Sequence, residues 1–341
     1  MDKVGIIFGG KSAEYEISLM SAAAVLRAID QEKHQITTIG ITKDGKWFVT
    51  EPDPEKIEHD EWREGARPIG YEELSSTIDF ALIIMHGNYG EDGRIQGVFE
   101  FLDIPYSGSG VLGTSITMDK IESKMALEAN RIPTPKYAWI NVDEYDEKKE
   151  RFMDTCEHDL GYPMFVKPSN TGSSIGICKV RTRQELEQGL QEAMQYDRRI
   201  IVEQGIDARE LETGVIGNGE PLAATVGEIK PAKDFYDYEA KYSDDAGTVI
   251  DVPADISKEI RDTIRKLAVD AYLTLDCTGF ARVDFLMDNK SGKIFVNEIN
   301  SIPGMTKYSM FPMLWSECGY SFRDILEKII RYGYERKESA H

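Results

Sequence analysis

Short apolar runs alternate with a helical pattern in the first third of this chain, and that order restricts the sheet that the chain can build. Val4–Phe8, Ile36–Ile41 and Phe80–Met85 are apolar runs of strand length, and residues 17–29 carry apolar side chains at helical spacing. A strand–helix–strand order predicts a parallel sheet in an α/β protein.

Two loops follow strand ends in this first part of the chain. Gly9–Ser12 comes after the first run, and His86–Gly93 comes after the third. Ligands of parallel sheets bind at the carboxyl ends of the strands, so both loops are candidate binding loops. Residues 50–75 lie between them, are polar and acidic and contain three prolines, and we expect a surface excursion there.

The charge and the hydropathy pattern restrict the partners. The formal charge of the 341-residue chain is −20, which argues against a nucleic-acid backbone or an anionic membrane surface as partner. No apolar run reaches the roughly 18 residues of a membrane span, and the N-terminus is predicted to be a first strand, so we expect a cytoplasmic protein. The four cysteines form no CxxC pair, so neither a zinc site nor a disulfide framework is expected.

Two glycine-rich stretches match nucleotide-binding patterns without the context that these patterns need. Gly5–Ser12 has the spacing of a P-loop, but Ile6–Phe8 form a strand, and an extended backbone cannot curl around a phosphate. A P-loop NTPase that uses Lys11 and Ser12 is therefore the less favoured alternative from a different class. Gly108–Gly113 has the spacing of a dinucleotide fingerprint, but it lacks a good preceding strand and the acidic residue that should follow.

A small-residue loop between two strand-like segments is a candidate phosphate site. Ser169–Gly176 offers many backbone N–H groups and the adjacent hydroxyls of Ser173 and Ser174, and Lys167 lies just before it. Such a loop can fold over a polyphosphate, with the lysine as a point charge beside it. The alternative is an ordinary β-hairpin with a flexible turn, although eight residues are long for one.

Acidic and amide side chains gather on two predicted strands joined by a tight turn, Gly279–Asp288 and Lys293–Asn300. Arg282 and Asp284 share one strand face, because strand side chains alternate. Asp284, Glu298 and Asn300 supply the hard oxygen ligands that magnesium prefers. The alternative is a pair of exposed strand faces with incidental acids.

Two further segments carry charged or aromatic side chains that suit a binding site. Residues 235–242 are dense in aromatic and charged side chains and suit an active-site lid, with a structured surface loop as the alternative. Glu14, in the stretch Ser12–Glu16 after the first strand, could hold a substrate ammonium, or it could be part of a solvated helix start.

Together these stretches resemble the D-alanine–D-alanine ligase family of ATP-grasp enzymes over nearly the whole chain. The matching stretches, in chain order, are Gly9–Glu14, His86–Gly87 with Gly90–Gly93, Met118–Lys120, Val166–Pro168, Gly172–Ser174, Tyr236–Tyr242, Gly279–Asp284 and Asn297–Thr306. The resemblance implies a three-domain α/β ATP-grasp fold. Its parts are an N-terminal parallel-sheet domain at 1–117, a central subdomain at 118–203 and a C-terminal subdomain with lid and metal site at 204–341.

The resemblance also implies a site for ATP and two magnesium ions, which manganese could replace. The implied ATP contacts come from Lys120, Lys167, Ser173, Ser174, Glu203, Gln204, Gly205, Ile206, Glu210 and Lys241. Among these, Glu203–Ile206 would be the adenine-binding hinge, Glu210 would hold the ribose, and Lys241 would reach the transferred phosphate. Asp284, Glu298 and Asn300 would hold the metal ions.

The implied substrate site lies between the two loops and the acidic strands. Glu14 would anchor the first D-alanine's ammonium and would form a triad with Ser173 and Tyr242 that links the lid to the site. His86 would sit near that substrate. The oxyanion would be stabilised by Arg282 and the Gly304 N–H, and the second substrate's carboxylate would be bound by Ser309 and the Met310 N–H.

The activity that the resemblance implies is ATP-dependent joining of two D-alanine molecules through an acylphosphate, for peptidoglycan precursors, by a homodimer. D-serine or D-lactate as second substrate are alternatives. The lid pattern of Tyr238, Lys241 and Tyr242 argues against lactate, and an apolar pocket at Met310 and Phe311 would suit the methyl group of alanine. A catalytically silent scaffold of the same fold is a further alternative, against which the complete metal-ligand set speaks.

Overall fold

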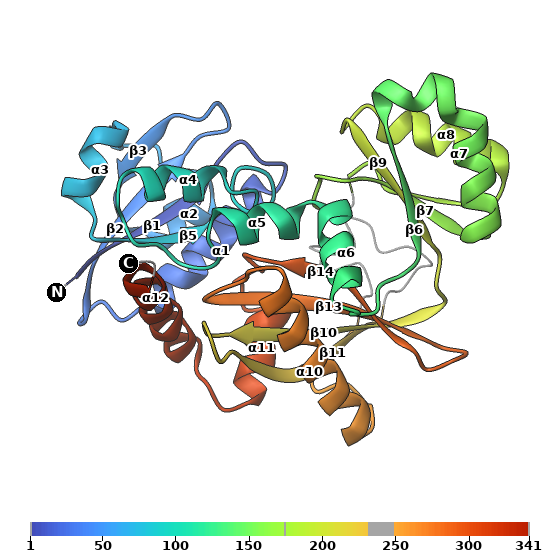
Figure 1. The fold of residues 1–341 in the computed structure, drawn as a ribbon. Coiled ribbons are helices and arrows are strands. Elements are labelled where there is room, and N and C mark those ends of the chain that lie inside the picture. The colour runs from blue at the N-terminus through green and yellow to red at the C-terminus, as the bar shows by residue number, and fades with distance from the viewer. Residues whose placement is uncertain (1, 174, 231–248, 340–341) are drawn as a thin grey trace.

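Three β-sheets organise the computed structural model, which describes residues 2–173, 175–230 and 249–339 (Figure 1). The first sheet has the spatial order β4 (Arg67–Pro68), β3 (Trp47–Thr50), β2 (His34–Ile41), β1 (Asp2–Gly9) and β5 (Phe80–Ile84). β1 runs parallel to both β2 and β5, as the sequence predicts, and β3 and β4 extend the sheet in antiparallel register. The predicted α/β class is confirmed.

The Gly5–Ser12 stretch does not form a phosphate loop. Gly5 lies inside β1 and is paired with Thr37 of β2 on one side and Ala81 of β5 on the other. A strand with hydrogen-bonded neighbours on both sides cannot wrap around a phosphate. The structure therefore excludes the P-loop alternative.

Residues 50–75 lie mostly at the surface, as predicted, but the segment forms regular elements and a few of its apolar side chains are buried in the core. The segment adds an edge strand to the first sheet and two short helices, α2 (Pro54–Glu58) and α3 (Tyr71–Thr77). The side chains of Ile57, Trp62 and Leu74 are at most 1% exposed, and the Trp62 ring packs edge-on against Phe8 with centroids 5.4 Å apart. The acidic, proline-rich composition hid these widely spaced core residues.

Helices from both ends of the chain cover the first sheet. α1 (Tyr15–Ala28) and the last helix, α12 (Phe322–Ser339), contribute buried residues such as Leu19 and Ile329 to one apolar core with β1 and β5. The two termini consequently lie near each other (Figure 1). Ser321 directly precedes α12, and its Oγ donates to Asp324 at 2.6 Å.

The second sheet forms a separate lobe with two helices. Its spatial order is β6 (Tyr137–Asn141), β9 (Arg199–Gln204), β7 (Met164–Pro168) and β8 (Cys178–Val180), and α7 (Tyr145–Asp159) and α8 (Arg183–Ala193) pack on it. Thr182 caps α8, because its Oγ1 accepts from the Glu185 N–H at 3.2 Å. The described start of the loop after β7 lies against other parts of the chain, since an added Cβ on Gly172 would be 3.0 Å from Glu14 Oε2.

The third sheet packs against a helix on one face and carries Arg282 and Asp284 on the other. Its spatial order is β12 (Val249–Asp251), β11 (Leu222–Lys230), β10 (Ala208–Ile216), β13 (Phe280–Asp288) and β14 (Ile294–Asn300). Leu211 and Val283 share a buried core with α10 (Lys258–Thr274), whose N-cap is Ser257. Because strand side chains alternate, Arg282 and Asp284 point away from α10. On that side α11 (Met310–Glu317) covers part of β10 and β11.

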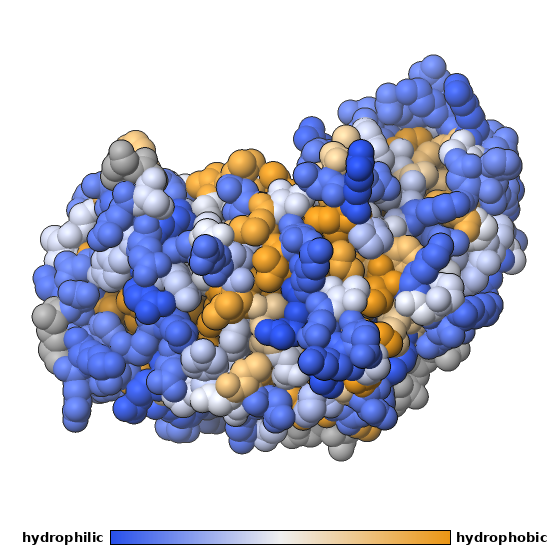
Figure 2. Space-filling view, turned by 60° about the horizontal axis from the view of Figure 1, so that its bottom comes forward, coloured by the Kyte–Doolittle hydropathy of each residue, from blue (hydrophilic) through white to orange (hydrophobic). Residues whose placement is uncertain are grey.

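Three helices connect the first sheet to the rest: α4 (Arg94–Phe101), α5 (Val111–Met118) and α6 (Lys120–Ala129). Leu127 of α6 belongs to the core of the third sheet, although α6 precedes the second sheet in sequence. The domain boundaries at residues 117 and 203 stay predictions. Within the described ranges, no helix combines the length and apolar character that crossing a bilayer requires. Hydrophilic residues cover most of the face in Figure 2, and apolar residues gather near its middle.

Candidate active site

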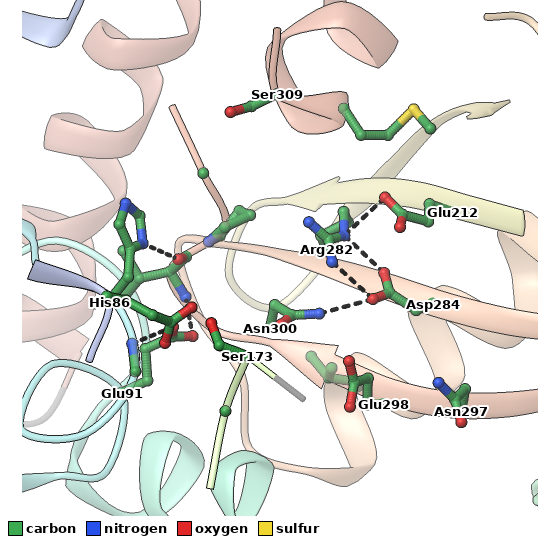
Figure 3. A pocket seen from close by; sticks show the side chains of 18 of the residues that line it. His86, Glu91, Ser173, Glu212, Arg282, Asp284, Asn297, Glu298, Asn300 and Ser309 are labelled. Carbon is green, nitrogen blue, oxygen red and sulfur yellow. Dashed lines mark hydrogen bonds and ion pairs between the residues drawn. The ribbon is translucent and has the colours of Figure 1, made fainter. Parts of the chain in front are cut away.

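A cavity of about 480 Å³ lies between the three sheets. The first sheet contributes the loops after β1 and β5, the second contributes the loop between β7 and β8, and the third contributes a face of β10, β13 and β14. In Figure 3, His86 and Glu91 lie on one side, and Arg282, Asp284 and Glu298 lie on the other. Of the two loops predicted from strand ends, His86–Gly93 lines the cavity through His86, Gly87 and Glu91. No residue of Gly9–Ser12 does, and the first residue after β1 on the cavity wall is Glu14.

A β-bulge aims two neighbouring side chains of β14 at the cavity. Asp284 is paired with Glu298, whereas the next residue, Phe285, is paired with Val296, so Asn297 is the extra residue. Such bulges re-aim side chains and are common beside active sites. Both Asn297 and Glu298 consequently line the cavity.

Arg282 is the centre of an ion-pair network on the cavity wall. Its Nε and Nη2 donate to the two carboxylate oxygens of Asp284, each at 2.7 Å, and Nε also lies 2.9 Å from Glu212 Oε2 on β10. Asn300 Nδ2 donates to Asp284 at 2.9 Å. The paired, forked contact fixes the plane of the guanidinium, so its position is set before a ligand binds.

The predicted metal ligands lie together on adjacent strands. Asp284 and Glu298 are register partners, and Asn300 lies opposite Arg282. The described residues contain no group of three or more His, Cys, Asp and Glu side chains that could hold a metal. The predicted magnesium ligands include an asparagine, so that count does not cover them. They are two carboxylates and one amide, and their oxygen atoms are the donors that a hard divalent cation takes. The donor chemistry therefore fits magnesium.

The Glu14 side chain reaches from the first sheet to the loop between β7 and β8 of the second sheet. An added Cβ on Gly87 would overlap its carboxylate, and one on Gly172 would lie 3.0 Å from its Oε2. Two glycines thus allow the backbones of the β5 loop and the small-residue loop to approach the same carboxylate. This places a negative charge in the cavity wall where a substrate ammonium could pair with it.

His86 lines the cavity, but both of its ring nitrogens are engaged. Nδ1 lies 2.8 Å from the Ile302 carbonyl, which can only accept, so Nδ1 carries the proton. Nε2 lies 2.9 Å from Ser21 Oγ, which also accepts from the Met305 N–H at 3.2 Å. Burial lowers the pKa of His86, so the ring is neutral. His86 therefore joins α1 to the segment after β14.

Glu91 makes a second connection to that segment. Its carboxylate accepts from the Gly87 N–H at 3.0 Å, the Ile302 N–H at 2.9 Å and Ser301 Oγ at 3.3 Å. Burial and the nearby charge of Glu14 raise the pKa of Glu91 to about 7. The loop after β5 is therefore fixed to the third sheet by a half-buried acid.

The small-residue loop presents a buried hydroxyl to the cavity. Ser173 has a left-handed backbone with φ 51°, and among the described residues its Oγ is buried without a hydrogen-bond partner. Its predicted neighbour Ser174 and the predicted lid residues Tyr236, Tyr238, Lys241 and Tyr242 lie outside the described residues.

The base of this loop is fixed to α6 by Asp119. The Asp119 carboxylate accepts from Ser169 Oγ at 2.6 Å and from Asn170 Nδ2 at 2.7 Å, and it also pairs with Arg199. The Lys120 N–H donates to the Ser169 carbonyl at 3.0 Å. Lys120 is thereby held beside the loop, where its ammonium donates to the Thr171 carbonyl at 2.6 Å.

The two lysines predicted to hold phosphate have different surroundings. Lys120 lines the cavity; burial lowers its pKa, and Glu298 opposes that shift most strongly. Lys167 does not line this cavity, and its Nζ donates to Glu203 Oε2 at 2.7 Å.

Most of the predicted adenine hinge is engaged within the protein. The backbone N–H groups of Gln204 and Gly205 donate to the carbonyls of Lys136 at 2.9 Å and Pro163 at 2.8 Å. Of the predicted nucleotide residues on this side, Glu210 lines the cavity and Glu203–Ile206 do not.

The predicted second-substrate site lies at the start of α11. Ser309 precedes the helix, and its Oγ accepts from the Thr306 N–H at 3.0 Å and lies close to Gly304, where an added Cβ would be 2.7 Å away. Met310 also lines the cavity, although it is 4% exposed. The prediction that Phe311 shares this apolar pocket is wrong, because Phe311 is fully buried against Phe280 and does not line the cavity.

Comparison with known proteins agrees with this geometry. A family model described as the D-Ala–D-Ala ligase N-terminus matches residues 3–109, and one described as its C-terminus matches residues 112–331. The chain belongs to the D-alanine–D-alanine ligase family. The resemblance stated from the sequence motifs is thereby confirmed.

Relatives and solved structures of this family match over almost their whole length. The D-alanine–D-alanine ligases of Clostridium novyi (strain NT) and Clostridium acetobutylicum are each 45% identical, over 98% and 99% of both chains. The VanG D-Ala:D-Ser ligase of Enterococcus faecalis is 36% identical with a TM-score of 0.89, covering 97% of this chain and 99% of that one. The D-alanine–D-alanine ligase of Coxiella burnetii is 30% identical with a TM-score of 0.86, covering 100% and 97%.

Sequence reasoning missed three charged residues around this ligase-family site: Glu91, Glu212 and Lys124. Glu91 lies in the Gly90–Gly93 stretch that carries the family resemblance, but no role was predicted for it, because the residues that it contacts, Ser301 and Ile302, are distant in sequence. Glu212 could have been found by alternation, since it follows Glu210 on the same face of a strand. Lys124 lies one helical turn after Lys120, which is a detectable spacing.

We expect Glu91 to make folding stability fall as pH rises. Its pKa is about 7 in the folded chain against an ordinary value of 4.5. Between these values the folded chain holds a proton that the unfolded chain releases, so stability is fully present below about 4.5 and is lost up to about 7. The loss from about pH 5 to about pH 8 should be about 2 to 3 kcal/mol.

Glu91→Gln cannot titrate and should lack this contribution. Urea titrations of both proteins at the two pH values give the difference in free energy of unfolding between wild type and variant. Any constant cost of the substitution cancels when the difference is compared across pH. The same difference at both pH values would show that Glu91 is ionised throughout.

Proposed function

We propose that this chain joins two D-alanine molecules with ATP, forming D-alanyl-D-alanine, ADP and phosphate. The observation that carries the proposal is one cavity with an acid on one wall and a fixed arginine beside paired acids on the other. Glu14 suits the ammonium of an amino acid, and Arg282 suits the oxygen atoms of its carboxylate. An α-amino acid can bridge the two.

The first chemical step activates a carboxylate. An oxygen of the first D-alanine's carboxylate attacks the γ-phosphorus of ATP, ADP leaves, and an acylphosphate forms. Lys120 is held beside the small-residue loop and adds positive charge near the transferred phosphate. Magnesium, held by Asp284, Glu298 and Asn300, would supply charge neutralisation for the phosphates.

The second step forms the peptide bond. The uncharged amine of the second D-alanine attacks the acyl carbon, and a tetrahedral oxyanion forms. The carbon–oxygen bond to phosphate then breaks as the carbonyl is restored, and the departing phosphate takes the extra proton of the nitrogen. Arg282 and the Gly304 N–H stabilise the oxyanion, and the Ser309 hydroxyl and the N-terminus of α11 bind the second carboxylate. Water must be excluded meanwhile, because it would hydrolyse the acylphosphate.

D-serine as second substrate is the second candidate, because the solved VanG structure is that of a D-Ala:D-Ser ligase. The side chain of Met310 favours D-alanine, since a thioether lining offers a hydroxymethyl group no strong partner.

The test is phosphate release with ATP and magnesium, first with D-alanine alone and then with D-serine or D-lactate added. We expect D-alanyl-D-alanine as the main product by mass, little changed by either competitor. A dominant mixed product would agree with the mechanism but would show that the second substrate is D-serine or D-lactate. The absence of D-amino-acid-dependent phosphate release would overturn the proposal.

A further inference from the structure

Lys124 is a fully buried lysine beside the proposed ATP site. It is 1% exposed, it does not line the cavity, and its Nζ lies 3.1 Å from Glu203 Oε1. The ammonium also donates to Thr134 Oγ1 at 2.9 Å and lies 5.7 Å from the centre of the Tyr137 ring. These contacts enclose Lys124 and keep it from reaching a ligand in the cavity.

One carboxylate holds two ammonium groups at this point. Glu203 Oε1 faces Lys124, and Oε2 accepts from Lys167 at 2.7 Å. The Glu203 side chain is 4% exposed and the Lys167 side chain 12%. Burial would raise the pKa of Glu203, but the two lysines outweigh it and hold the pKa at about 2, so the carboxylate is ionised.

The charge of this cluster explains why a second lysine is needed. With Lys167 alone, Glu203 would form a neutral buried pair. Moving that lysine toward a phosphate would leave a buried carboxylate unpaired, which is strongly unfavourable in proteins. With Lys124 in place, the carboxylate keeps a partner 3.1 Å away. Burial lowers the pKa of Lys124, and the charge of Glu203 opposes that shift most strongly.

We propose that Lys124 is a positioning residue, the permanent counter-ion of Glu203, and that it leaves the Lys167 ammonium able to bind the phosphates of ATP. The inference rests on the proposed function for the identity of the nucleotide. It assigns no contact between Lys124 and any substrate, so its effect must pass through Glu203 and Lys167.

The test is a double-mutant cycle on ATP affinity, measured by calorimetry with magnesium and without D-alanine. Lys124→Met should raise the Kd for ATP at least about tenfold, because Glu203 then holds Lys167 alone. In the background of Glu203→Gln the same substitution should change the Kd by less than about threefold, since no carboxylate competes for Lys167. The KM for D-alanine should stay within about threefold in all variants.

The control is Lys136→Met, which removes the same charge from an exposed site on the neighbouring linker. Lys124→Gln keeps a donor for Thr134 and replaces Lys124→Met if that variant does not fold. A folded Lys124 variant with the wild-type Kd, or an equal effect of the substitution in both backgrounds, would overturn the inference. A wild-type chain that binds no ATP would overturn the proposed function instead.

Discussion

Glu298→Ala should lower turnover at least about a hundredfold, because it removes one of the two carboxylates proposed to hold magnesium. Glu298 is paired with Asp284 across the β13–β14 ladder and lines the cavity beside Lys120. Without it, the developing charge on the transferred phosphate loses the neutralisation that a metal would provide. The measurement is the steady-state rate at rising magnesium concentration, where the variant should also need more metal for half-maximal rate.

The matched control is Glu220→Ala, which makes the same change at an exposed site between β10 and β11. It should keep the wild-type rate and magnesium dependence. A folded Glu298→Ala protein with near-normal turnover would show that the metal assignment is wrong, whatever the control does.

Arg282→Met should lower kcat by about a hundredfold to a thousandfold, the usual effect of losing one oxyanion donor. Arg282 also holds Asp284 and Glu212, so the variant should be less stable as well. The measurements are kcat for peptide formation and the melting temperature.

A second substitution separates these two effects. Adding Glu212→Gln to Arg282→Met removes a buried charge that has lost its partner, and it should recover part of the melting temperature without recovering turnover. Arg282→Lys keeps the charge but not the planar fork, and should stay impaired. Recovery of turnover along with stability in the double variant would mean that Arg282 acts only on the fold.

The local patterns predicted the acidic wall of the site well. Alternation along Gly279–Asp288 and Lys293–Asn300 placed Arg282 with Asp284 and Glu298 with Asn300, and the structure pairs these strands. The bulge at Asn297 was not predictable, because a register shift depends on the partner strand as well as on its own sequence.

The contacts between sheets were beyond sequence reasoning. Glu91 bonds to residues more than 200 positions away, and Glu203 pairs with Lys124 across the second lobe and α6. Their partners are set by how the sheets approach one another, which no local period encodes. The buried role of Trp62 was missed for a related reason, since its neighbours in sequence are mostly charged while its neighbour in space is Phe8.

The transfer of oxygen from D-alanine to phosphate tests the proposed reaction most directly. D-Alanine labelled with heavy oxygen in its carboxylate is converted with ATP and magnesium, and the released inorganic phosphate is analysed by mass. Reaction through an acylphosphate predicts one labelled oxygen in the phosphate for every peptide formed, because the carbon–oxygen bond of the intermediate breaks when the amine attacks. Peptide formation with unlabelled phosphate would contradict the acylphosphate mechanism.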